Sequence, residues 1–288
     1  MIGTAPIDWF VCMRIFGDAL DFERISETLH VSASKAWRAG DRLLSGRAVP
    51  MDVWILDSPL AHTEPVDVHL AWFRRELLPH YGFLRSLKGT AEISSYCGLS
   101  VDSDRCSFRI SGEALRIFKE LNISMEFGLV FTGYPDSTTE RSEPKPSECE
   151  AEKPEFVPGT YRTESEVAFE VVGAGLDLSS ISSQLGFDPS KAHHLGETDS
   201  AGDQHPSDSW SLVAPLPRTD ALDGHLKWLG MSLLPHASFL RSLKYKAELL
   251  VRCNFGTESD SGGLGVSPEG MRVCTDLDIP LELNAFLI

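Results

Sequence analysis

The chain repeats itself at one fixed offset, and this repeat constrains its fold more than any other feature. Trp54 matches Trp210 and Glu126 matches Glu282, each pair 156 positions apart. From 17 to 127, roughly two positions in five are identical to their partners without a gap. We therefore expect two tandem copies of one domain, each able to bury its own core.

The segment between the copies has a different composition. Residues 133–165 are rich in Pro, Glu and Ser and poor in apolar side chains. Such a segment cannot bury enough surface to fold. We predict a first repeat at 1–132, a disordered acidic linker at 133–165 and a second repeat at 166–288.

Apolar spacing predicts the same element order in each repeat: strand, helix, strand, helix, strand, strand, helix, strand. Apolar residues alternate at 11–15 and 123–131 in the first repeat, which is the period of a half-buried strand. Alternating rather than continuously apolar strands favour a mostly antiparallel sheet with helices on one face. The predicted fold class is α+β.

Local signals give the expected helix starts, loops and turns. The predicted N-caps are Asp21, Thr63 and Ser111, with the same positions in the second repeat at Asp177, Thr219 and Ser267. Residues 30–53 and 186–209 have no sustained period and are interpreted as long loops. The run Ser261-Gly262-Gly263 is interpreted as a hairpin turn.

Both copies share one order of motifs: a short helix, a loop with Ser-Lys, a glycine, a strand with Trp and a helix with His-Leu. The short helix reads Ile25-Ser26-Glu27-Thr28-Leu29 in the first copy and runs from Ile181 to Gly186 in the second. This arrangement resembles the bacterial domain-of-unknown-function 4279 family. The resemblance covers nearly all of the chain outside the linker. It implies a bacterial protein and supports the α+β fold, and it brings no catalytic residues.

The charge of the chain limits its partners. Forty-two acidic against 26 basic side chains give a net charge of −16 with histidines neutral. Such a field repels phosphate backbones and attracts cationic surfaces. We therefore expect no direct nucleic-acid partner and favour a basic protein, although the same charge also serves solubility alone.

Targeting signals and cysteine spacing indicate the compartment. Residues 1–21 do not read as a secretion signal, and no segment has the roughly 18 uninterrupted apolar residues that a membrane span needs. The six cysteines form no closely spaced pairs. We expect a cytoplasmic protein with buried, reduced thiols and no membrane association. The oligomeric state stays open.

Six residues retained in both repeats are candidates for contact with a ligand. The lysines lie in the long loops, where binding residues tend to concentrate, or they are solvated. The tryptophans could stack on a ligand or fill the core. The histidines could be ligands or bases, or boundary residues with a satisfied hydrogen bond. These candidates are Lys35, Lys191, Trp54, Trp210, His69 and His225.

No catalytic residue, cofactor or metal site is predicted. Neither a nucleophile with its base nor a pair of carboxylates recurs in both copies. The second long loop holds His193, His194, Glu197, Asp199, Asp203 and His205, but their spacing fits no standard metal site.

These observations favour a non-catalytic cytoplasmic protein-binding module, for instance an immunity protein that neutralises a basic bacterial toxin or enzyme. The alternative is a small-molecule or metal-binding protein, or an enzyme, that uses the long loops of each repeat.

Overall fold

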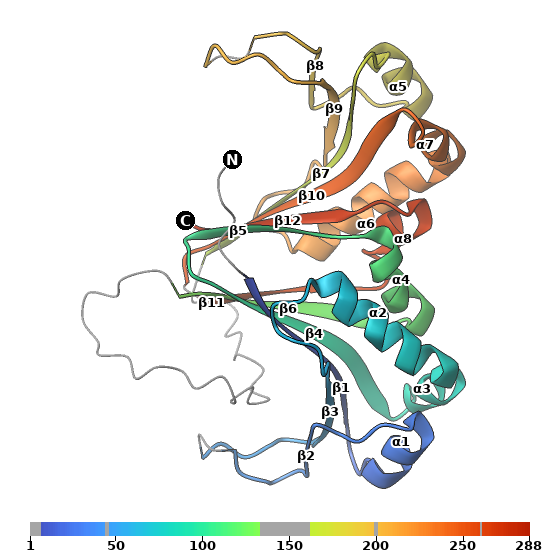
Figure 1. Cartoon of the computed structure of the whole chain (residues 1–288), viewed down its shortest axis with the longest axis vertical. Helices are drawn as coiled ribbons and strands as arrows, with labels where there is room; N and C mark the ends of the chain where they lie inside the picture. The colour runs from blue at the N-terminus through green and yellow to red at the C-terminus, as the bar shows by residue number, and fades with distance from the viewer. Residues whose placement is uncertain (1–6, 44–45, 133–161, 199–200, 260) are drawn as a thin grey trace, which may run out of the picture.

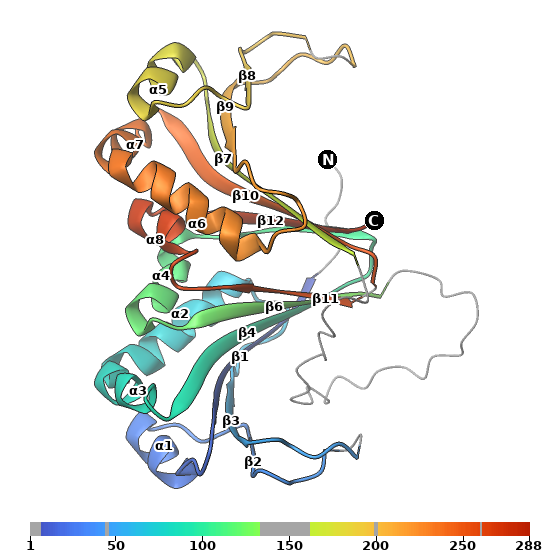
Figure 2. The same cartoon turned by 180° about the vertical axis from the view of Figure 1, so that it is seen from behind.

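The computed structural model describes residues 7–43, 46–132, 162–198, 201–259 and 261–288. Two sheets lie along the long axis of the molecule, and the helices of both repeats cover the same side of them (Figures 1 and 2). In the described part of the chain no helix covers the other face of either sheet, and we call these two surfaces the open faces. The predicted α+β class with helices on one face is confirmed.

The first repeat follows the predicted order, with a short extra strand and a helix split at Pro79. Its elements are β1 (Ile7–Gly17), α1 (Phe22–Leu29), β2 (Lys35–Trp37), β3 (Asp52–Asp57), α2 (Val66–Leu77), η1 (Leu78–His80), α3 (Tyr81–Leu87), β4 (Ala91–Val101), β5 (Arg105–Ile110), α4 (Gly112–Leu121) and β6 (Ser124–Phe131).

The second repeat has the same elements at equivalent positions. They are β7 (Thr163–Gly173), α5 (Leu178–Leu185), β8 (Lys191–His193), β9 (Asp208–Val213), α6 (Leu222–Leu233), η2 (Leu234–His236), α7 (Ala237–Leu243), β10 (Ala247–Thr257), β11 (Ser261–Val266), α8 (Arg272–Leu277) and β12 (Leu281–Leu287). None of the helices in the described part of the chain is long and apolar enough to cross a bilayer.

Each sheet has six strands, but one of the six comes from the other repeat. The orders are β11-β6-β4-β1-β3-β2 and β5-β12-β10-β7-β9-β8. Strands β4 and β6 run parallel, as do β10 and β12, and the other pairs are antiparallel. Strand β5 therefore lies in the sheet of the second repeat and β11 in the sheet of the first (Figure 1). We call β5 and β11 the exchanged strands.

The strand exchange corrects two predictions. Ser261 to Gly263 is not a hairpin turn but the start of β11, which pairs with 128–130 of β6. The two repeats do not bury separate cores, because most of their buried apolar side chains belong to one continuous cluster that spans both repeats. Strand β4 pairs with β1 on one edge and β6 on the other, so β5 cannot form a hairpin with β4 and instead pairs with the outer edge of β12.

Helix starts agree with the predicted caps at some positions and differ at others. The side chains of Asp21, Asp177 and Ser111 accept hydrogen bonds from backbone N–H groups in the first turn. The predicted caps Thr63 and Thr219 are wrong, because α2 and α6 begin two residues later, after Pro65 and Ala221, whose backbone is extended. Ser267 caps the turn that leads into α8, because its Oγ accepts from the Gly270 N–H at 3.2 Å, while α8 itself begins later, at Arg272.

The predicted loops and linker have more structure than expected at their ends. The loops 30–53 and 186–209 contain β2 and β8, and each holds a further isolated bridge, Arg42 with Ala48 and Thr198 with Gln204. Strand β7 begins at Thr163, so the last three residues of the predicted linker are part of a strand. Residues 133–161 lie outside the described residues.

Candidate functional site

The predicted tryptophans lie in the core. Trp54 and Trp210 are 0% exposed and point from β3 and β9 toward the helices. Each indole Nε1–H donates to a serine hydroxyl, of Ser26 at 3.2 Å and of Ser182 at 3.0 Å. A buried indole with its N–H satisfied fills the core and offers no ring face to a ligand.

The predicted histidines are buried in the same layer. His69 of α2 and His225 of α6 are both 1% exposed. The Nδ1 of His69 lies 2.8 Å from the Ser58 hydroxyl, and the Nε2 of His225 lies 3.2 Å from the Pro217 carbonyl oxygen. Burial lowers the pKa of His69. Both rings therefore tie a helix to the segment before it, and neither reaches the surface.

The predicted lysines alone reach an accessible surface, and both lie on the open faces. Lys35 of β2 is half-buried, with its Nζ 5.8 Å from the centre of the Phe10 ring. It faces Asp57, whose pKa is raised by burial and lowered, to a smaller extent, by the Lys35 charge. Lys191 of β8 is exposed beside Glu170. The open faces are therefore where retained polar residues meet solvent.

On the open face of the first sheet, aromatic side chains surround the buried guanidinium group of Arg14. Arg14 is only 5% exposed, and its Nη2 donates to Glu126 at 2.7 Å. Its guanidinium carbon lies 4.8 Å from the Tyr96 ring centre and 5.4 Å from that of Phe16. Such cation–π contacts stabilise a cation that burial would otherwise disfavour. The apolar residues Cys12, Val49, Val53 and Ile55 form a small second cluster on this face.

A glycine on β6 makes room for the tyrosine of this face. A Cβ at Gly128 would lie 1.9 Å from the Tyr96 hydroxyl oxygen. The ring therefore lies flat across β4 and β6, where any side chain at position 128 would displace it.

The open face of the second sheet carries an ion-pair ladder, which we define as Glu170, Arg252, Glu282, Arg109 and Glu248. Arg252 donates from Nε to Glu282 at 2.9 Å and pairs through Nη1 with Glu170 at 3.2 Å. Arg109 pairs through Nη2 with Glu282 at 2.9 Å and through Nη1 with Glu248. Arg109 belongs to β5, so the first repeat supplies one cation of the ladder.

The electrostatics of the ladder follow from its crowding. Burial is the main cause of a raised pKa at Glu170, and the nearby Glu282 adds to it against the opposing charge of Arg252. The hydrogen bond to Glu282 is the main cause of a raised pKa at Arg109. Charges that alternate across neighbouring strands hold one another in place through charge-assisted hydrogen bonds.

The two open faces share a scaffold and differ in chemistry. Glu126 and Glu282 are the same position in the two repeats, and each pairs with an arginine. The arginines come from different strands, because Arg14 corresponds to Glu170 and Tyr96 to Arg252. The two repeats therefore share one carboxylate, whose surroundings are aromatic in the first repeat and charged in the second.

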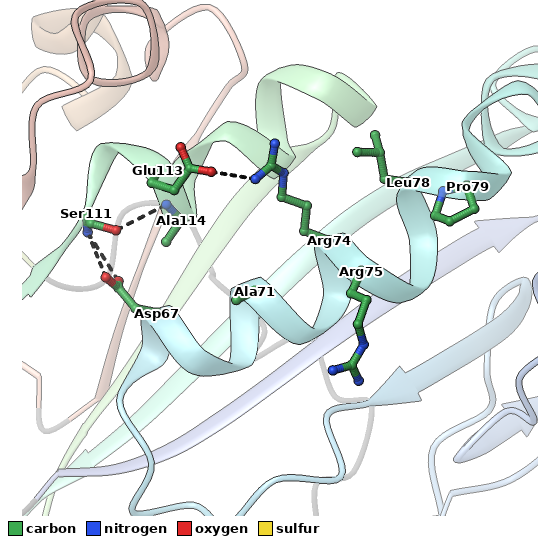
Figure 3. A pocket seen from close by; sticks show the side chains of 9 residues that line it. All are labelled: Asp67, Ala71, Arg74, Arg75, Leu78, Pro79, Ser111, Glu113 and Ala114. Atoms are coloured by element: carbon green, nitrogen blue, oxygen red, sulfur yellow. Dashed lines mark hydrogen bonds and ion pairs between the residues drawn. The ribbon is translucent and has the colours of Figure 1, made fainter.

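A groove of about 730 Å³ lies on the helix side, between α2 and α4 (Figure 3). Asp67 accepts from the Ser111 N–H at 3.2 Å, and Arg74 joins α2 to Glu113 of α4. Arg75 lies on the rim. The complete lining is Asp67, Ala71, Arg74, Arg75, Leu78, Pro79, Ser111, Glu113 and Ala114. The second repeat has Gly230 and Met231 in place of the two arginines, so the arginine lining of this groove is particular to the first repeat.

Four cysteines are buried as unreactive thiols. Burial raises the pKa of Cys97 and Cys274 to about 12, that of Cys106 to about 11, and that of Cys253 well above its ordinary value. Because the thiolate is the nucleophile, these groups are inert at neutral pH.

The histidine-rich loop of the second repeat brings two rings together. His193 and His205 stack with ring centres 3.5 Å apart, and the Nδ1 of His194 lies 3.4 Å from Asp208. Asp199 is outside the described residues. In the described ranges, no three His, Cys, Asp or Glu side chains come together in a way that could hold a metal ion.

Sequence reasoning missed the carboxylates that hold the loops in place. Asp208 accepts from the backbone N–H of Leu176 and of Leu195, both at 2.8 Å, and Asp52 does the same in the first repeat with Leu20 and Ala39 at 2.9 Å. These backbone hydrogen bonds lower the pKa of both carboxyls. The sequence signal that could have found them is that positions 52 and 208, which are equivalent in the two repeats, are both aspartate. The ladder could not be found in this way, because Glu248 and Glu282 have identical partners, Glu92 and Glu126, but neither of the two arginines does.

Comparison with known proteins places the chain in one family. No curated protein matches it. The family model described as a domain of unknown function (DUF4279) matches twice, over residues 7–131 and 162–285. These matches cover most of the chain and coincide with the two repeats, so the protein belongs to the DUF4279 family as a tandem pair of its domains.

Proposed function

We propose that the chain is a non-catalytic, cytoplasmic protein-binding module of a bacterium, which neutralises a basic partner in the manner of an immunity protein. The observation that carries the proposal is the uneven distribution of charge. Residues 162–288 hold 18 Asp and Glu against 9 Lys and Arg, whereas residues 7–131 hold 17 against 14. A field of one sign steers an oppositely charged protein toward the second repeat.

The open face of the second sheet supports the same proposal. Its ladder presents carboxylates in fixed positions, and charge-assisted hydrogen bonds to a partner's arginines or lysines are stronger than neutral ones. Glu248 is exposed at the end of the ladder and forms an ion pair with Arg109. A partner cation can bind Glu248 without opening the core.

The burial of the reactive side chains agrees with binding rather than catalysis. His69 and His225 are enclosed, and the thiols with raised pKa values are protonated at neutral pH. General bases and nucleophiles must reach their substrate.

The test is to purify the tagged protein from its host at low salt, identify a stoichiometric partner and measure its affinity against salt concentration. We expect a basic protein whose affinity falls steeply with salt. Glu248→Gln should weaken binding several-fold, whereas Glu92→Gln, the same position in the first repeat, should change it little. Equal effects of the two variants, or an affinity independent of salt, would contradict the proposal.

The groove in Figure 3 favours a second candidate function, the binding of a small molecule. Its volume is within the range of ligand pockets, roughly 300–1,000 Å³. Thermal shifts across a metabolite panel test this function, and Ala71→Trp, which fills the groove from its exposed wall, should abolish any shift. A shift that survives Ala71→Trp would place the ligand elsewhere.

A further inference from the structure

We infer that the two repeats form an obligate pair, in which the exchanged strand of each repeat binds only to the other repeat, and that this pair stays assembled when the peptide between the repeats is cut. The surface concerned is the edge of β6 or β12 together with the core beneath it. Its occupant is the exchanged strand of the other repeat.

The first argument comes from the backbone. All six residues of β11 pair with β6, and all six of β5 pair with β12. Without the other repeat, each sheet would lose its sixth strand and leave a row of N–H and C=O groups unpaired. Unpaired strand edges are unstable or bind another strand.

The second argument comes from the side chains of β5. The backbone of Phe108 pairs with Leu283 of the second repeat, whereas its ring packs on two aromatic residues of the first. The ring centres are 4.8 Å from Trp9 and 5.9 Å from Phe127. Phe108 is 9% exposed, and its counterpart on β11, Leu264, is 8% exposed. Separation of the repeats would expose both side chains to water.

The third argument is a close backbone approach at Gly112, the first residue of α4. A Cβ there would lie 2.7 Å from the carbonyl carbon of Asp278 and 2.7 Å from the nitrogen of Ile279. Both atoms are backbone of the other repeat and cannot rotate away. The backbones of the repeats therefore meet at a distance that only glycine allows, which is typical of a closely packed interface.

Ion pairs between α4 and the second repeat fix the orientation of the interface. Lys119 pairs with Asp276, and Arg116 pairs with Asp278 at 3.4 Å. These pairs are partly exposed, so each contributes little free energy. The paired edges and the shared core contribute most of the stability.

The experiment uses the full chain with a site-specific protease sequence inserted between Ser142 and Glu143. After cleavage, light scattering and native mass spectrometry should show one particle with both halves at the mass of the intact chain, 31.7 kDa plus the insert. The melting temperature should depend on protein concentration only after cleavage, because unfolding then separates two molecules. Two separate particles, precipitation on cleavage, or melting independent of concentration would overturn the inference.

A pair of glycine variants locates the interface. Gly112→Ala should raise the concentration at which the cleaved halves separate by at least about tenfold. Gly82→Ala, in helix α3 with no atom near the added methyl group, should leave it unchanged. Circular dichroism of the uncut variants shows whether both fold. Equal behaviour of the two cleaved variants would show that the close approach at Gly112 does not hold the halves together.

Discussion

Replacement of Phe108 by alanine should destabilise both repeats together, although the residue belongs to the first. The ring is 9% exposed and contacts Trp9 and Phe127 across the shared core. Truncation of a buried phenylalanine costs about 3–5 kcal/mol, through lost burial and the cavity left behind. Folded proteins are stable by only about 5–15 kcal/mol, so the loss is a large fraction of the total.

Urea unfolding with hydrogen exchange resolved by peptide measures this effect. We expect a lower midpoint with an unchanged slope, since the surface exposed on unfolding stays the same. Amide protection should fall in β6 and in β12 alike, because β5 pairs with β12 while its phenylalanine packs beside β6.

Two controls accompany the variant. Leu264→Ala, at the equivalent position on β11, should also lower protection in both sheets, with a loss of about 2–5 kcal/mol. Ser107→Ala, at an exposed neighbour of Phe108 on the open face, should be nearly neutral. Loss of protection confined to the first repeat, or two separate unfolding transitions, would refute the shared core.

Three further predictions follow from the site. The pKa of Asp208 is lowered in the folded protein, so the stabilisation from its hydrogen bonds is fully present above pH 3.8, the ordinary pKa of an aspartate, and is lost as the pH falls through the folded-state pKa. Asp208→Asn should therefore flatten the loss of stability toward acid pH, measured by urea unfolding at several pH values. An unchanged loss of stability at acid pH would contradict the assignment. Cys97 and Cys253 should resist a thiol reagent in the native protein at mildly alkaline pH and react once it is unfolded in urea; rapid native labelling would show that they are accessible. Gly128→Ala should lower the free energy of unfolding in urea, because the added methyl group displaces the Tyr96 ring. The loss should vanish when Tyr96 is also replaced by alanine. An equal loss with and without the tyrosine would show that the Tyr96 contact is not the cause.

Much of each repeat could be predicted from apolar period and internal identity. The alternation at 11–15 and 123–131 reports a strand with one buried face, and β1 and β6 confirm it. The caps at Asp21 and Ser111 were predicted because a helix start needs a local acceptor close in sequence. The short strand β2 was interpreted as loop, because three residues show no period.

The candidate surface was predicted only in part, because a residue can be identical in both repeats for a structural reason as well as for a functional one. Trp54 and His69 are identical in both repeats and lie in the core. Lys35 and Lys191 lie on the open faces, as surface residues should. The ladder joins Arg109 to Glu248 and Glu282 across 139 and 173 residues, and no local pattern connects positions so far apart.

The duplication, the element order of each repeat and the excess of acidic charge can be read from the amino-acid sequence, because each depends on residue identity, apolar period or composition and not on which strands pair. The exchange of β5 and β11, the core shared by the two repeats and the place of Arg109 in the ladder of the other repeat become apparent in the three-dimensional fold. The pairing of a strand depends on which edge is free. Both edges of β4 are taken by β1 and β6, and the edge that β5 occupies belongs to β12, which lies far from it in sequence.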